Sequence, residues 1–241
     1  MQKPTRPFRF DMVIFDVGGT LIGFRDRTPF QEFLADAGLP ATDEHAQILQ
    51  RRFLTNISDS REEAKGLGAD GRQLNDWWKG NLAQIWPDHP HLAEEMLSWL
   101  LEGRFDTLYE DVFPTFDALQ ELGLGISILS NWGTHLRAVL RRFGLDQYAQ
   151  FVIVSAEVGI AKPDPRIFHL AISKAGSPPH RLLYVGDHIG DDIEGAQSAG
   201  LDALLIDRGN RHSLATDKKI GDLRQVVHYV KYPSPYPFSE P

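Results

Sequence analysis

Hydrophobic and polar residues follow two different patterns along this chain. Residues 12–15 (MVIF) form a short apolar run that stops at Asp16, which predicts a buried strand. From about residue 24 to residue 108, apolar residues recur instead at helical spacing, as in PFQEFLADAG and HLAEEMLSWLLEG. This helical pattern is interrupted at residues 38–40, 66–71 and 86–87. We find no strand pattern in this stretch and expect it to be all helical.

After residue 108 the two patterns alternate, beginning with a helix at 113–123. Short apolar runs predict strands at 124–130, 151–155, 181–187 and 202–207. Helical spacing predicts helices at 134–144, 165–176 and 191–200, and a last helix at about 221–230. The proline-rich tail KYPSPYPFSEP is expected to be extended or disordered.

This alternation predicts an α/β fold. Strands separated by helices are typically parallel, and continuous apolar strands indicate a sheet that helices cover on both faces. The expected fold is therefore a doubly wound parallel sheet with an all-helical domain inserted after its first strand. We expect residues 1–23 and 108–241 to form the core, and residues 24–107 to form the insert.

Composition excludes several functions. The 241 residues carry a formal charge of -8 with no basic stripe, so nucleic acid is not an expected partner. The chain has no cysteine, which excludes disulfides, thiolate metal sites and cysteine nucleophiles. No apolar run is long enough to span a bilayer, and no apolar segment follows the basic start MQKPTRPFRF. We expect a cytoplasmic protein with no membrane partner; no pattern specifies an oligomeric state.

Candidate chemistry collects where the predicted strands end. Asp16 ends the first strand, Ser130 and Asn131 end the second, Lys162 follows the third, and VGDHIGDD follows the fourth. Because ligands of open α/β sheets bind at the carboxyl ends of the strands, these residues are expected around one pocket.

The residue types at this pocket suit phosphoryl transfer. Clustered carboxylates repel one another, and a hard divalent cation such as Mg²⁺ relieves that repulsion. Lys162 can neutralise an anionic substrate, while the Ser130 hydroxyl and the N–H groups of the Gly18-Gly19 turn can hold phosphate oxygens. Asp16 can act as a nucleophile that forms an aspartyl-phosphate. The expected partner is therefore a small phosphorylated molecule.

Four sequence motifs resemble those of the haloacid dehalogenase (HAD) superfamily of hydrolases. They occur in the family's order as DVGGT, LSN, AKPDPRIF and GDHIGDDIEGA. The resemblance covers about residues 10–24 and 108–230, and it implies a Rossmann-like core. The helical insert resembles the cap of the subgroup with a small α-helical cap, the C1 type.

The resemblance also implies residue roles. It assigns catalysis to Asp16, Ser130 and Lys162, with Asp16 as the nucleophile. Mg²⁺ would be held by Asp16, the backbone carbonyl of Gly18, Asp187 and a second acid of the fourth motif. Spacing to the following Gly-Ala favours Asp192 for that acid over Asp191. We expect the phosphate to be bound by Gly18, Gly19, Thr20, Ser130, Asn131 and Lys162.

Gly18 departs from the family pattern. Phosphatases of this family usually carry a second aspartate there, in the motif DxDGT, as the general acid and base. A positioned acid–base group contributes about 10²–10⁴ in rate. The chain is therefore expected to be a weak phosphatase, to use esters with good leaving groups, or to borrow another proton carrier. His188 and His135 are the candidates for that carrier, and Trp132 is a candidate wall over the substrate.

Two other functions remain open at this point. One is C–P bond hydrolysis, because phosphonate-cleaving members resemble this chain in lacking the second acid. Those members need a cap lysine, for which Lys65 and Lys79 are candidates without a supporting motif. The other is a catalytically impaired binding or regulatory protein. Dehalogenating members also lack the second acid, but they are not expected to keep an acidic fourth motif such as GDHIGDD.

Overall fold

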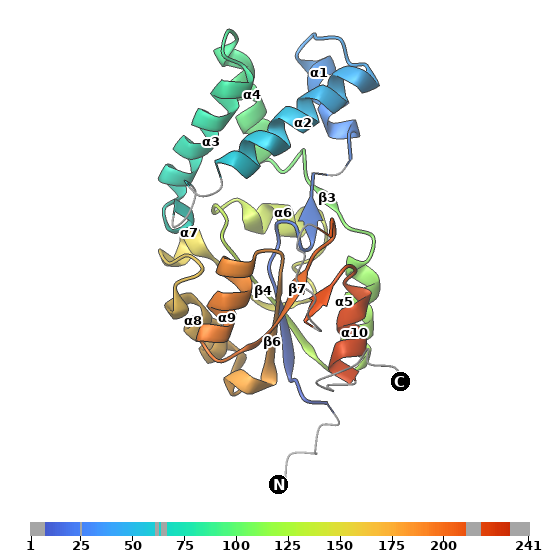
Figure 1. The fold of residues 1–241 in the computed structure, drawn as a ribbon, viewed down its shortest axis with the longest axis vertical. Helices are drawn as coiled ribbons and strands as arrows, with labels where there is room; N and C mark the ends of the chain where they lie inside the picture. Colours follow the sequence, from blue (N-terminus) through green and yellow to red (C-terminus); the bar gives the residue numbers. More distant parts are fainter. Residues whose placement is uncertain (1–7, 25, 61–62, 64–66, 211–217, 232–241) are drawn as a thin grey trace.

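The chain folds into a sheet-containing core with a group of helices above one end of it (Figure 1). A computed structural model describes residues 8–24, 26–60, 63, 67–210 and 218–231. Most of the proline-rich tail lies outside these residues. No helix in these described ranges is long and apolar enough to cross a membrane.

Six parallel strands form the main sheet. Their spatial order is β5-β4-β1-β6-β7-β8, so the chain starts in the middle and builds outward on both sides. The strands are β1 (Met12–Phe15), β4 (Gly125–Ser130), β5 (Ala149–Val154), β6 (Leu182–Gly186), β7 (Asp202–Ile206) and β8 (Lys219–Ile220). The predicted doubly wound parallel sheet is confirmed.

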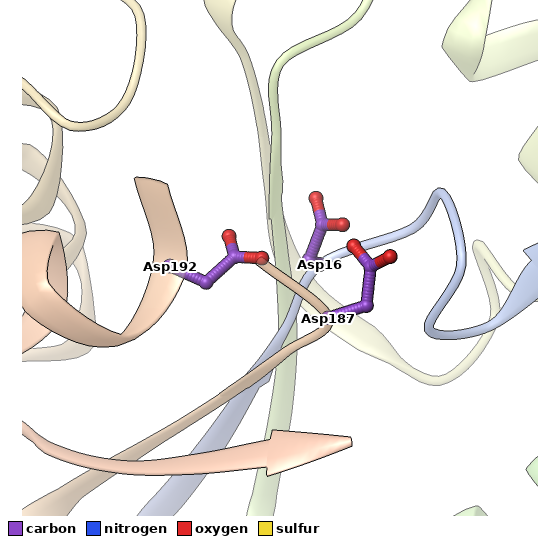
Figure 2. A group of neighbouring side chains, drawn as sticks. All are labelled: Asp16, Asp187 and Asp192. Carbon is purple, nitrogen blue, oxygen red and sulfur yellow. The ribbon is translucent and has the colours of Figure 1, made fainter. Parts of the chain in front are cut away.

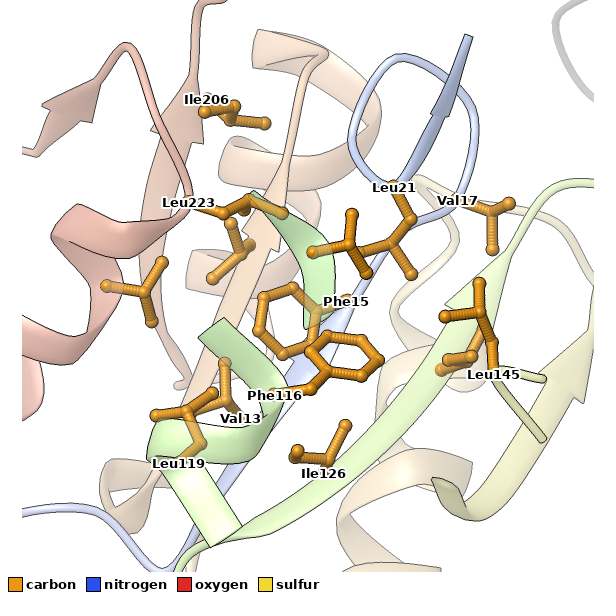
Figure 3. Packing of buried hydrophobic residues seen from close by; sticks show 14 of the residues in the cluster. Val13, Phe15, Val17, Leu21, Phe116, Leu119, Ile126, Leu145, Ile206 and Leu223 are labelled. Atoms are coloured by element: carbon orange, nitrogen blue, oxygen red, sulfur yellow. The ribbon is translucent and has the colours of Figure 1, made fainter. Parts of the chain in front are cut away.

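Helices cover both faces of this sheet because successive strand residues point to opposite sides. Val13 and Phe15 of β1 belong to a cluster with α5, α6 and α10, in which the Phe15 and Phe116 ring centroids lie 5.1 Å apart (Figure 3). Met12 and Ile14 belong to a second cluster with α8 and α9. The helices are α5 (Val112–Glu121), α6 (Leu136–Arg142), α8 (Pro165–Ala175), α9 (Gly195–Ser198) and α10 (Arg224–Lys231).

Four helices lie between β1 and β4 in sequence and form the group above the sheet (Figure 1). They are α1 (Thr28–Asp36), α2 (Asp43–Asp59), α3 (Gly71–Ile85) and α4 (Pro90–Leu101), with a 3₁₀ turn at Leu67–Ala69. Their buried side chains make a separate hydrophobic cluster rich in aromatic rings. We call residues 24–107 the cap, and treat these bounds as a proposal.

The expectation of no strand up to residue 108 is wrong at its end. Thr107–Leu108 (β3) pairs antiparallel with Ile22–Gly23 (β2), so the two chain crossings between core and cap lie side by side. A strand of two residues cannot show the alternation from which strands are predicted.

Two further boundaries differ from the expectation. Ser155 does not end a strand but begins the short helix α7 (Ser155–Val158). The helix expected at 191–200 starts earlier as a π-helical turn, Ile189–Glu194, and continues as α9. π-turns inside helices occur often at functional sites, and this one carries acids of the fourth motif.

Candidate active site

The predicted site residues come together at the carboxyl ends of the central strands. Asp16 follows β1, Ser130 ends β4, and Asp187 follows β6. Asp16 and Asp187 are 6% exposed and Ser130 is 1% exposed, so all three lie at the edge of the core rather than on an open surface.

The Asp16 carboxylate is fixed by two donors. The Ser130 hydroxyl donates to its Oδ1 at 2.8 Å, and the Lys162 ammonium donates to the same oxygen at 2.7 Å. Both bonds end on Oδ1, and Asp16 also lines a cavity. Burial raises the pKa of Asp16 from 3.8 to about 6, Lys162 opposes this increase, and Asp192 and Asp187 add to it.

Lys162 is held by a second carboxylate and a phenol. Its Nζ donates to Asp192 Oδ1 at 2.5 Å and to the Tyr184 hydroxyl at 3.1 Å. Burial alone would lower the pKa of Lys162, but the Asp16 and Asp192 carboxylates raise it well above its usual value. The ammonium therefore stays charged at the nucleophile.

Asp16, Asp187 and Asp192 form a buried acidic group (Figure 2). Each offers one oxygen, and these oxygens lie within 4.8 Å of one another. An all-carboxylate set suits a hard cation such as Mg²⁺. The Asp192 Oδ2 also accepts from the His188 N–H at 3.0 Å. The structure thus places Asp192, rather than Asp191, in the group.

The turn after β1 differs in part from what we expected. The Gly19 N–H donates to the Ile22 carbonyl at 2.8 Å and the Thr20 N–H donates to the Val17 carbonyl at 3.2 Å, so both donors are used within the turn. Thr20 is fully buried, its hydroxyl has no hydrogen-bond partner, and it does not line the cavity. Gly18 and Gly19 do line it.

Gly19 is required by both conformation and space. Its φ is +73°, in the left-handed region, and a Cβ there would lie 2.3 Å from Asp187 Oδ2. The glycine therefore allows the Asp187 carboxylate to lie against the turn. Gly18 has no such conformation, and a Cβ on it would meet the Trp132 ring at 3.4 Å.

Asn131 holds the Lys162 loop. Its Nδ2 donates to the Lys162 carbonyl at 2.9 Å, and its Oδ1 accepts from the Lys162 N–H at 2.8 Å. Asn131 lines the cavity, so it lies beside the expected phosphate position as well as bracing the lysine.

A cavity of about 300 Å³ joins these residues to the cap. Its core side includes the acids, Lys162 and Trp132, which confirms that Trp132 faces the cavity. His135 and His188 also line it. His135 accepts from the Trp132 indole N–H at 2.8 Å, and burial lowers the pKa of His135, so it is neutral near pH 7.

Tyr184 and Ser155, which hold residues of the core side of the site, escaped the sequence reasoning. Tyr184 bonds to Lys162 and to the Leu129 carbonyl; its only signal is a hydroxyl within the apolar strand RLLYVGD. Ser155 accepts from the Trp132 N–H at 3.0 Å and donates to the cap carbonyl of Gly68 at 2.5 Å. No signal in the sequence connects Ser155 with Gly68.

Comparisons with known proteins agree with the motifs. A family model described as haloacid dehalogenase-like hydrolase matches residues 10–200. A phosphoserine phosphatase of Thermus thermophilus is 35% identical over 57% of this chain and 57% of its own length. A glyceraldehyde 3-phosphate phosphatase of Methanothermobacter thermautotrophicus is 30% identical over 80% of this chain and 84% of its own length.

The fold is also that of solved structures. YfnB of Bacillus subtilis, solved with magnesium bound, superposes with a TM-score of 0.73 at 21% identity, over 93% of this chain and all of that one. At this identity, the likeness concerns the fold.

Proposed function

Because the chain belongs to the haloacid dehalogenase-like hydrolase family, it is a hydrolase, and we propose that it is a magnesium-dependent phosphatase of small phosphate monoesters. The observation that carries the proposal is the environment of the Asp16 carboxylate. Its carboxylate is buried, held on one oxygen by Ser130 and Lys162, and placed in a cavity beside two further acids. The phosphatase names of the two relatives support the same class of substrate.

Each residue has a role in this proposal. Asp16 attacks phosphorus and forms an aspartyl-phosphate, which water then hydrolyses. Lys162 keeps Asp16 ionised and balances charge on the phosphate oxygens, and Asn131 and Asp192 hold Lys162 in place. Asp16 and Asp187 would hold Mg²⁺, with Asp192 beside them, and the cation would supply neutralisation of phosphate charge.

A screen of phosphorylated metabolites with Mg²⁺ tests the proposal. Asp16→Asn should abolish phosphate release, whereas Lys162→Ala should lower it through lost charge neutralisation. Calorimetry should show weaker Mg²⁺ binding for Asp187→Ala, and little change for the neighbouring control Asp191→Ala. Hydrolysis that survives in Asp16→Asn would show that another site or a contaminant is responsible.

The acidic group separates this proposal from its alternatives. Three clustered carboxylates that could hold a divalent cation favour phosphoryl transfer over dehalogenation. For C–P hydrolysis a cap lysine is needed; Lys79 is exposed and does not line the cavity, and Lys65 lies outside the described residues. Cleavage of phosphonoacetaldehyde would favour that alternative. Mg²⁺ binding without turnover of any phosphate would favour a regulatory protein.

A further inference from the structure

We propose that the substrate is the phosphate monoester of an uncharged aromatic alcohol. Three features favour this class: the apolar side chains on the cap side of the cavity, the pairing of the cavity lysine with two aspartates, and the glycine at position 18. This inference rests on the proposed phosphatase function and specifies its substrate.

The cap side of the cavity is an aromatic and aliphatic wall. It is formed by Phe24, Ile57, Leu74, Trp77, Trp78 and Leu100. Trp77 and Trp78 lie with ring centroids 4.7 Å apart in an edge-to-face arrangement. The Trp77 indole nitrogen is buried without a hydrogen-bond partner, so it adds no accessible polar atom to this wall. Such a wall binds a flat apolar group and leaves a charged group unsolvated.

The described lining of the cavity offers no unpaired lysine or arginine to a second anionic group. Among the described residues that line it, Lys162 is the only lysine or arginine, and it is already paired with Asp16 and Asp192. Asp106, near the start of β3, is an acid, and burial lowers the pKa of His135 so that it is neutral. A leaving group that carries a carboxylate or a second phosphate would therefore find no unpaired lysine or arginine among these described residues.

Position 18 favours the same leaving group for a separate reason. The Trp132 ring lies 3.4 Å from where a Gly18 Cβ would be, so an aromatic ring lies beside the position that lacks a proton donor. A phenol, with a pKa of about 10 as in tyrosine, departs as an anion far more readily than an aliphatic alcohol, whose pKa is much higher and close to that of water.

The reaction balances without a general acid. A carboxylate oxygen of Asp16 forms a bond to phosphorus, and the bond from phosphorus to the aryl oxygen breaks with its electron pair on that oxygen. The phenolate leaves and takes a proton from water. A second water then attacks the phosphorus of the aspartyl-phosphate, and the bond from phosphorus to the Asp16 oxygen breaks with its electron pair on the carboxylate. Inorganic phosphate leaves, and the proton lost by this water neutralises the hydroxide formed when the phenolate was protonated.

Four esters separate the effect of aromatic binding to the cap side of the cavity from the effect of the leaving-group pKa. Phenyl phosphate is aromatic and has a good leaving group, and 2-phenylethyl phosphate is aromatic but has a poor leaving group. Propyl phosphate is not aromatic and has a poor leaving group. Phosphoserine carries charged groups on its alcohol part. With Mg²⁺, 2-phenylethyl phosphate should have a KM about tenfold below that of propyl phosphate, because its ring is buried. Phenyl phosphate should have the highest kcat, and phosphoserine the lowest kcat/KM.

A charge placed in the wall provides the matched test. Leu74→Arg should raise kcat/KM for phosphoserine and lower it for phenyl phosphate, each by about tenfold, because a cation replaces apolar surface. Leu54→Arg is the control, since Leu54 is a cap leucine 43% exposed and outside the cavity lining. It should leave both values unchanged.

The outcomes distinguish the inference from the function on which it rests. Acetyl phosphate, activated but not aromatic, reports the Asp16 chemistry alone. If acetyl phosphate is hydrolysed while phenyl and 2-phenylethyl phosphate show no advantage over propyl phosphate, or phosphoserine is preferred, the inference is overturned and the phosphatase stands. If no ester and no acetyl phosphate is hydrolysed, the proposed function falls and the inference falls with it.

Discussion

At the scale of single residues, position 18 decides how much catalysis the site can supply. Gly18 lacks the left-handed φ that Gly19 has, so its backbone accepts a side chain. Gly18→Asp should raise kcat on alkyl phosphates such as propyl phosphate by up to about 10²–10⁴, the usual contribution of a positioned acid–base group. Phenyl phosphate should gain much less. A Cβ contact of 3.4 Å to Trp132 requires the indole to adjust, which sets the gain below the upper figure.

Gly18→Asn is the isosteric control for this prediction. It has the same shape as aspartate and crowds Trp132 equally, but it carries no transferable proton. Equal rates of Gly18→Asp and Gly18→Asn on propyl phosphate, in folded variants that bind Mg²⁺, would show that a missing proton carrier does not limit the reaction.

Asp106 makes the stability of the chain depend on pH. It is 5% exposed, its Oδ2 has no hydrogen-bond partner, and burial raises its pKa from 3.8 to about 7 against the opposing effect of Arg142. Between about pH 4 and pH 7 the unfolded chain releases this proton and the folded chain keeps it. The free energy of unfolding therefore falls across that range and levels off above it.

Asp106→Asn removes this pH dependence. The free energy of unfolding of the variant, minus that of the unsubstituted protein, should increase from pH 4.5 to pH 7.5. The increase should be about 4 kcal/mol at most, since one pKa unit corresponds to about 1.4 kcal/mol. Urea unfolding at the two pH values measures it. Asp59→Asn, at an exposed aspartate of α2, is the control and should show no such gain. A stability difference that is the same at both pH values would contradict the assignment to Asp106.

At the scale of elements, the parallel strands could be predicted and the contacts between cap and core could not. Asp16 and Lys162 are 146 positions apart, yet their meeting follows from the rule that parallel strand ends share one edge of the sheet. Ser155 and Gly68 are 87 positions apart, and no such rule connects a short helix with a cap turn. The two-residue strands β2, β3 and β8 are likewise too short to leave a pattern.

The Ser155 hydroxyl connects the cap with the core loop that carries Trp132. Ser155→Ala leaves the Gly68 carbonyl and the Trp132 N–H without this partner, at a cost of about 1–3 kcal/mol. The arrangement in which the cap is held against the core by this bond should be less populated. KM for phosphate esters should therefore rise by about tenfold or less, with a smaller change in kcat.

Acrylamide quenching of tryptophan fluorescence provides a second measurement of the same change. Ser155→Ala should increase quenching because Trp77, Trp78 and Trp132 line the cavity between cap and core. Ser98→Ala, which removes an exposed cap hydroxyl bonded to Glu102, should match the unsubstituted protein in both measurements. Unchanged KM and quenching in Ser155→Ala would show that this bond does not hold the cap.

At the scale of the whole molecule, the cap and the core have hydrophobic clusters of their own. The cap cluster draws its buried residues from 30–105 alone, whereas the two core clusters draw theirs from residues 10–22 and 112–230. Pairing of β2 with β3 brings the two chain crossings together. Such an arrangement supports the proposed boundaries at 24 and 107, and it implies that the cap can lose structure while the sheet and its acids persist.

Phe53→Ala tests this independence. Phe53 is 1% exposed, and its ring packs against Phe24, Phe30, Trp78 and Phe105 with centroids 5.0 to 6.1 Å away. Truncation should cost the cap about 3–5 kcal/mol. Hydrogen exchange should then lose protection in α1 to α4, while amides of β1, β4 and β6 keep theirs. Mg²⁺ affinity should change less than about twofold, because Asp16, Asp187 and Asp192 all lie in the core.

Phe116→Ala is the matched truncation in the core, where Phe116 is fully buried against Phe15. It should cost a similar amount, lower protection in the strands, and weaken Mg²⁺ binding, because β1 carries Asp16 at its end. The contrast between the two variants is the test. If Phe53→Ala lowers protection in β1, β4 and β6 as much as in α1 to α4, the chain unfolds as one cooperative unit, and the cap is not a separate domain in the energetic sense.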